Sequence, residues 1–93
     1  MQKKIYIAGK ITGDPDYKEK FKDIEEDLID EGNIVLNPAE LPEGMGYEDY
    51  MEICFAMIRQ ADEVHFLDDW RDSKGAIREW YFAKAHNKKI VEL

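Results

Sequence analysis

Short apolar runs alternate with segments of helical periodicity along the whole chain, and this alternation restricts the possible folds more than any other feature. Four runs rich in Ile, Val and aromatic residues are expected to form strands, at residues 4–8, 34–36, 64–67 and 89–91. Three segments with apolar residues at helical spacing lie between them, at about 14–32, 47–61 and 74–86. This βαβαβαβ order predicts a parallel sheet with right-handed connections. We therefore expect a three-layer α/β fold, Rossmann-like or flavodoxin-like, with strand order 2-1-3-4 and three main helices.

Capping signals and apolar stripes define the expected helices. Asp14 and Pro15 supply a cap and a first-turn proline for the first helix, which should end near Gly32. Its apolar residues recur at steps of four, three and four and predict one narrow buried stripe. The stripe consists of Tyr17, Phe21, Ile24 and Leu28. The second helix has a wider apolar face, which indicates packing on the sheet and on a second subunit.

The composition limits the number of domains and the classes of partner. Ninety-three residues predict one domain, 1–93. The 21 acidic and 13 basic residues give a net charge of −8, which argues against a nucleic-acid polymer and leaves small molecules and proteins as partners. No apolar stretch approaches the roughly 20 residues that cross a bilayer, so we expect a soluble, cytoplasmic protein with no membrane partner. Cys54 is the only cysteine, and with two distant histidines we expect no metal site and no cofactor.

The loops after the first and third strands form the expected ligand-binding edge. A 2-1-3-4 sheet reverses its winding between these strands, and ligands bind at their carboxyl ends. The first loop has glycines around a lysine and a threonine, but it lacks the ending of a P-loop, and a tight turn with a solvent-facing lysine is the alternative. The second loop combines basic residues with aspartates that oppose them. The candidate binding residues are Gly9, Lys10, Ile11, Thr12, Asp69, Arg71, Ser73 and Gly75.

A carboxylate one turn inside the third helix is the best catalytic candidate. Ser73 can cap this helix, and Gly75 lets a ligand approach backbone N–H groups that no helical carbonyl accepts. Such free donors suit a phosphate. Glu79 follows Gly75 by four residues, so both lie on one helix face. The alternative is an ordinary solvated glutamate.

Three segments resemble the nucleoside 2-deoxyribosyltransferase superfamily and its nucleotide N-hydrolase relatives. They are Ile5-Tyr6-Ile7-Ala8-Gly9, Gln60-Ala61-Asp62-Glu63-Val64, and Ser73 and Gly75 followed by Glu79. The resemblance covers nearly the whole chain. It implies that Glu79 attacks the anomeric carbon of a 2-deoxynucleoside unit to form a covalent deoxyribosyl-enzyme, and that Tyr6 orients Glu79. The same resemblance implies that Ser73 and Gly75 bind a phosphate, which favours a nucleotide over a nucleoside as the substrate. It also implies subunits that complete each other's sites.

One position departs from the pattern of this superfamily. The characterised enzymes have an aspartate on the second helix where this chain has Cys54, and a thiol with an ordinary pKa of about 8.5 is a poor general acid. Asp49, Glu52 or Asp69 could supply a proton instead. Two functions therefore stay open. One is cleavage or transfer at an N-glycosidic bond with Glu79 as nucleophile, and the other is a nucleotide-binding or regulatory module without catalysis.

Aromatic residues of the expected third helix predict a homodimer or a higher homo-oligomer. Trp80, Tyr81 and Phe82 are consecutive and so cannot all face one side of a helix. A symmetric contact through the second and third helices would bury the outward-facing rings and enlarge a small core. The alternative is a monomer in which the turn-rich segment 37–46, also a possible lid, folds over these aromatics.

Overall fold

The computed structural model describes residues 2–93 and contains a four-stranded, fully parallel sheet. The strands are β1 (Lys4–Ala8), β2 (Ile34–Leu36), β3 (Glu63–Phe66) and β4 (Lys89–Glu92), in the order β2-β1-β3-β4. The helices are α1 (Tyr17–Asp30), α2 (Tyr47–Gln60) and α3 (Lys74–Ala85), with 3-10 turns at Pro38–Glu40 and Trp70–Asp72. The predicted fold class and strand order are confirmed.

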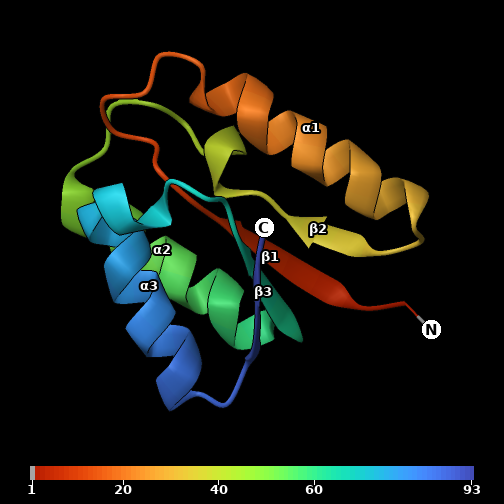
Figure 1. Ribbon diagram of the computed structural model, residues 1–93. Helices are drawn as coiled ribbons and strands as arrows, with labels where there is room; N and C mark the ends of the chain where they lie inside the picture. The colour runs from red at the N-terminus through yellow and green to blue at the C-terminus, as the bar shows by residue number, and fades with distance from the viewer. Residues whose placement is uncertain (1) are drawn as a thin grey trace.

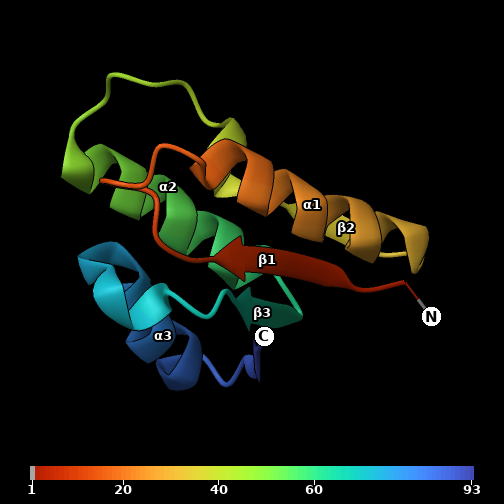
Figure 2. The same ribbon diagram turned by 45° about the horizontal axis from the view of Figure 1, so that its top comes forward.

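The sheet separates two helical layers. α1 packs on one face of the sheet, while α2 and α3 pack together on the other (Figure 1, Figure 2). Side chains alternate along a strand, so Ile5 and Ile7 of β1 face α1, and Tyr6 and Ala8 face the other two helices. β1 is therefore covered on both faces, as expected for an inner strand of a parallel sheet.

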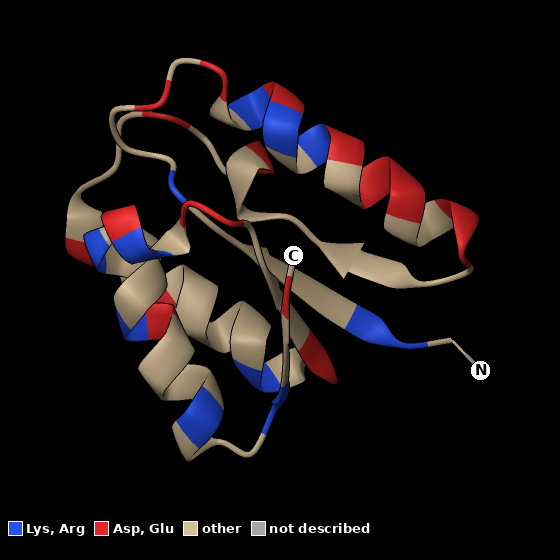
Figure 3. Cartoon of the chain, viewed as in Figure 1, with Lys and Arg blue, Asp and Glu red and all other residues tan. Residues whose placement is uncertain are grey.

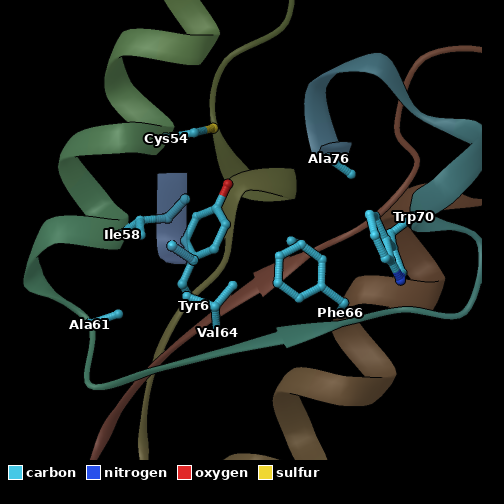
Figure 4. Close-up of a cluster of buried hydrophobic side chains, with 10 residues drawn as sticks. Tyr6, Cys54, Ile58, Ala61, Val64, Phe66, Trp70 and Ala76 are labelled. Carbon is cyan, nitrogen blue, oxygen red and sulfur yellow. The ribbon is translucent and has the colours of Figure 1, made fainter. Parts of the chain in front are cut away.

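The main core lies between the sheet, α2 and α3. Tyr6, Val64 and Phe66 project from β1 and β3 toward Cys54 of α2 and Ala76 of α3 (Figure 4). Full burial of a side chain such as Phe66 stabilises the fold by roughly 1.5–3 kcal/mol. Because alanine is small, Ala76 allows the first turn of α3 to approach the sheet closely. This close approach brings the start of α3 next to the end of β1.

α1 begins later than predicted. Asp14 and Pro15 lie in the turn before the helix, which begins at Tyr17 with Asp16 at the cap position. Asp14 Oδ1 accepts a hydrogen bond from the backbone N–H of Asp16 at 2.9 Å, and Asp14 Oδ2 accepts one from Lys20 Nζ at 2.7 Å. The predicted cap is therefore wrong by two residues, because Asp16 occupies the cap position and the Asp14 carboxylate stabilises the turn before the helix.

The remaining sequence predictions for α1 agree with the structure. Phe21 and Leu28 are buried, and Tyr17 and Ile24 pack against the same cluster, so the predicted stripe is confirmed. Lysines lie in the first half of the helix, and acidic residues dominate the second half (Figure 3). This order opposes the helix dipole, which favours acidic residues at the start. In the described part of the chain, no helix combines the length and the apolar character required to cross a bilayer.

Gly9 is required for packing rather than for backbone conformation. A Cβ atom at this position would lie 2.5 Å from Leu67 Cδ1 and 2.9 Å from Leu67 Cβ. We predict that Gly9→Ala lowers the free energy of unfolding by about 1–3 kcal/mol through overpacking, measured by urea denaturation. In the Leu67→Ala background the same substitution should cost clearly less. An equal cost in both backgrounds would show that the contact with Leu67 Cδ1 is not the cause.

Candidate functional site

A pocket with a volume of about 330 Å³ lies at the carboxyl end of β1. Its walls come from Tyr6 of β1, the loop after β1, Tyr17 at the start of α1, the segment from Pro38 to Met45, the first half of α2, and the start of α3. This is the switch point of the sheet, where ligand sites of open α/β folds occur. The topology thus brings together segments that are distant in sequence.

Tyr6 and Glu79 form the buried polar centre of the pocket. The Tyr6 hydroxyl donates a hydrogen bond to Glu79 Oε2 at 2.8 Å. Tyr6 is the middle residue of β1 and Glu79 lies in the second turn of α3, so the bond joins the sheet to the helix. Glu79 is 6% exposed and still lines the pocket. The predicted proximity of Glu79, Tyr6 and the loop after β1 is confirmed, whereas the catalytic roles stay predictions.

Burial controls the proton affinity of Glu79. It raises the pKa of this carboxyl group to about 7, although the Tyr6 hydroxyl and the Cys54 thiol act in the opposite direction. A carboxyl group with such a pKa exchanges its proton readily near neutral pH, which is a common property of catalytic groups.

Cys54 adjoins the same centre from α2. Figure 4 shows the Tyr6 hydroxyl pointing toward the Cys54 thiol. Burial, with the nearby Glu79 as a smaller cause, raises the pKa of Cys54 to about 12. The thiol therefore keeps its proton at neutral pH and is neither a nucleophile nor an effective acid.

Five of the predicted binding residues line the pocket. They are Gly9, Ile11, Thr12, Ser73 and Gly75. Ser73 caps α3 as predicted, because its Oγ accepts a hydrogen bond from the backbone N–H of Ala76 at 3.1 Å. The reason for a glycine at position 75 is partly different from the predicted one. A Cβ there would lie 3.3 Å from Met51 Sδ, so Gly75 also allows α2 and α3 to pack closely.

The other three predicted residues lie outside the pocket. Arg71 pairs with Glu92 at 3.1 Å and lies over the Trp70 ring. Asp69 accepts a hydrogen bond from the backbone N–H of Lys10 at 3.0 Å and also binds Lys20. Asp69 therefore ties the loop after β3 to the loop after β1. The role of Lys10, Asp69 and Arg71 in substrate binding stays a prediction.

The segment 37–46 covers the pocket rather than the aromatic residues of α3. Leu41, Glu43 and Met45 of this segment line the pocket. The Tyr50 hydroxyl donates to the Pro42 carbonyl at 2.6 Å and accepts from the Met45 N–H at 3.2 Å, and Lys18 pairs with Glu43 at 2.8 Å. The alternative in which this segment folds over the aromatics of α3 is therefore wrong, because these contacts hold it beside α1 and α2.

Sequence reasoning missed a tyrosine-rich part of the wall. Tyr17, Tyr47 and Tyr50 line the pocket. Tyr47 directly follows the segment rich in Pro and Gly, and Tyr50 comes three residues later, so this juxtaposition was an available signal. Within the described chain, no cluster of three or more His, Cys, Asp or Glu side chains could hold a metal ion.

The raised pKa of Glu79 predicts a pH-dependent stability. The folded protein retains this proton up to about pH 7, whereas the unfolded chain loses it at about pH 4.5. Between these two pH values the unfolded state binds fewer protons than the folded state. The stability that Glu79 contributes is therefore fully present below about pH 4.5 and is lost as the pH rises to about 7. Replacing Glu79 by neutral Gln should remove this loss.

The test is to measure the free energy of unfolding by urea denaturation at about pH 5 and at about pH 8. Between these two pH values the wild type should lose about 2–3 kcal/mol more than Glu79→Gln. Glu52 is exposed on α2, and Glu52→Gln serves as the matched control with a wild-type pH profile. If both variants follow the wild-type profile, Glu79 is not a carboxyl group with a raised pKa.

The comparisons with known proteins agree with the geometry. The solved structure of the 2-desoxiribosyltransferase from Leishmania mexicana is similar with a TM-score of 0.77 and 23% sequence identity. The match covers 98% of this chain and 63% of that protein, so this chain spans less than two thirds of its length. The two proteins share the deoxyribosyltransferase fold. Among curated proteins, no sequence matches. Residues 3–92 match the family described as "Domain of unknown function (DUF4406)", and the chain belongs to this family.

Proposed function

We propose that the protein cleaves or transfers at the N-glycosidic bond of a nucleotide or nucleoside, with Glu79 as the nucleophile. The observation that carries this proposal is the Tyr6–Glu79 hydrogen bond of 2.8 Å in the wall of the pocket. The fold shared with a 2-desoxiribosyltransferase supports a nucleoside-type substrate. A volume of about 330 Å³ is at the lower end of the usual range for ligand pockets.

The geometry suits covalent glycoside chemistry. Tyr6 holds Oε2 of Glu79, which restricts rotation of the carboxyl group and orients it toward the anomeric carbon. Attack by the carboxylate replaces one difficult displacement with two easier ones through a glycosyl-enzyme ester. Only the ionised carboxylate attacks, so the rate should increase with pH through about 7.

The second candidate is a nucleotide-binding or regulatory module without catalysis. Cys54 favours it, because a thiol that keeps its proton adjoins Glu79 where an acid is expected. In that case the pocket binds the same compounds without breaking a bond.

The activity test is a screen of nucleosides, 2′-deoxynucleosides and their monophosphates for free base. We expect Glu79→Gln to lower base release by at least about 100-fold while the far-UV circular dichroism is unchanged, because an amide is not a nucleophile. Glu26 is exposed on α1 and does not line the pocket, so Glu26→Gln should retain wild-type turnover. Base release that persists in Glu79→Gln would exclude Glu79 as nucleophile. Thermal stabilisation by a compound that the wild type does not cleave would favour the binding module.

A homo-oligomer formed by α2 and α3 is also part of the proposal. Tyr47 and Ile53 of α2 are 43% and 36% exposed, and Tyr81 of α3 is 65% exposed. The exposed side chains of α1, by contrast, are mostly charged. A symmetric contact through α2 and α3 would bury their exposed apolar side chains. One domain over 1–93, a cytoplasmic location and the lack of a polymer partner stay predictions.

We expect light scattering at micromolar concentration to give at least twice the chain mass of 10.9 kDa. Tyr81→Glu should lower the mass toward that of the monomer, because burial of a charge in an apolar contact is unfavourable. Ile29→Glu is the matched control, because Ile29 is 51% exposed on α1. A monomer mass for the wild type would refute the oligomer.

A further inference from the structure

We propose that the substrate is a nucleoside whose base carries a fixed positive charge, such as a pyridinium or an N7-alkylated purine. This inference rests on the proposed cleavage by Glu79. It adds the chemical class of the leaving base, which follows from the charges around the pocket and from the groups that could protonate that base.

The charged residues of the pocket favour a cation. Among its lining residues are two carboxyl groups, Glu43 and Glu79, and no Lys, Arg or His. Lys18 balances Glu43 at 2.8 Å, whereas Glu79 forms no ion pair in the described part of the chain. Bringing a positive base next to Glu79 would stabilise the carboxylate form that attacks. The tyrosine side chains in the wall also suit a flat, charged ring.

The positive N-terminal end of α3 also borders the pocket. Ser73 and Gly75 line it there, and backbone N–H groups at a helix start attract oxygen atoms. The hydroxyl groups of a sugar can meet these donors without an additional negative charge. Lys10 and Arg71, the two cations among the predicted binding residues, do not line the pocket.

The pocket has no effective acid for a leaving base. Burial raises the pKa of the Cys54 thiol to about 12 and that of the Tyr6 hydroxyl well above its usual value. The Lys18 ammonium lowers the pKa of Glu43, so this residue stays ionised. Asp49, Glu52 and Asp69, the alternative acids, do not line the pocket. A neutral base would leave as an unprotonated anion, which is slow.

A positively charged base does not need that proton. As a Glu79 carboxylate oxygen forms a bond to C1′, the C1′–N bond breaks and its electron pair stays on the ring nitrogen, which cancels the positive charge. The base leaves neutral. Water then attacks C1′ of the ester, the Glu79 carboxylate is released, and one proton passes to solvent. Each turnover therefore consumes one water and releases one proton.

The test uses pairs of compounds that differ in charge but little in shape. They are nicotinamide riboside with its reduced dihydro form, and 7-methylguanosine with guanosine, each as riboside and 2′-deoxyriboside. Because charged glycosides are also less stable in buffer, the measured quantity is the rate of base release divided by the uncatalysed rate. We expect this acceleration to be at least about 100-fold larger for the charged member of each pair. A pH-stat should record one proton per nicotinamide released.

The outcomes separate this inference from the proposed function. If both members of each pair, or the neutral monophosphates, are accelerated equally and Glu79→Gln abolishes the reaction, the function stands and the inference is wrong. If the wild type cleaves none of these compounds and none of the neutral compounds of the earlier screen, the proposed function fails and the inference falls with it.

A gain-of-function variant tests the missing acid directly. Cys54→Asp places a second carboxyl group beside Glu79, and two such neighbours cannot both ionise readily, so one keeps a proton near neutral pH. We expect Cys54→Asp to increase cleavage of guanosine or its 2′-deoxy form above that of both the wild type and the matched Cys54→Ser, whose hydroxyl is not an effective acid. Circular dichroism verifies that both variants fold. No increase in a folded Cys54→Asp would contradict the explanation by a missing acid.

Discussion

The buried hydrogen bond between Tyr6 and Glu79 connects the fold of this protein to its chemistry. It joins the middle of β1, an inner strand covered on both faces, to the second turn of α3. An unpaired polar group at this depth would cost about 1–3 kcal/mol, so each side chain depends on the other. The small residues Ala76 and Gly75 allow α3 to approach closely enough for the bond to form. A polar pair in an otherwise apolar core is therefore also the centre of the pocket.

The lysines near the pocket organise its loops instead of facing its interior. Lys20 binds both Asp14 and Asp69, and Lys18 binds Glu43, so the start of α1 holds three separate loops. This explains why lysines occupy the first half of α1 against the preference of the helix dipole. The carboxyl group of Glu79 forms no ion pair in the described chain, although the charge of the neighbouring Arg78 slightly favours its ionised form. Lys10 and Arg71, the cations among the predicted binding residues, lie outside the pocket, so its interior favours a positive ligand.

Sequence reasoning succeeded where a short-range pattern has only one favourable solution. The strand runs and their connections led to the parallel sheet and its order, because right-handed crossovers leave few alternatives. The Ser73 cap was found because the cap and the amide that it accepts lie three residues apart. Sequence reasoning failed where one side chain has several possible partners. The carboxylate of Asp14 could cap α1, but it binds Lys20 and the backbone of Asp16 instead.

The sequence by itself determined the fold class and the switch-point location of the site. These follow from periodicity and topology, which depend on residue type and spacing. The pairing of Glu79 with Tyr6 was expected only from the resemblance to the deoxyribosyltransferase superfamily. Only the tertiary structure decided that segment 37–46 covers the pocket, that Asp69 ties two loops together, and that Arg71 lies outside. The physical reason is that loop positions depend on contacts between residues distant in the chain. The proton affinities of Glu79 and Cys54 likewise depend on burial, which exists only after the helices and the sheet have packed.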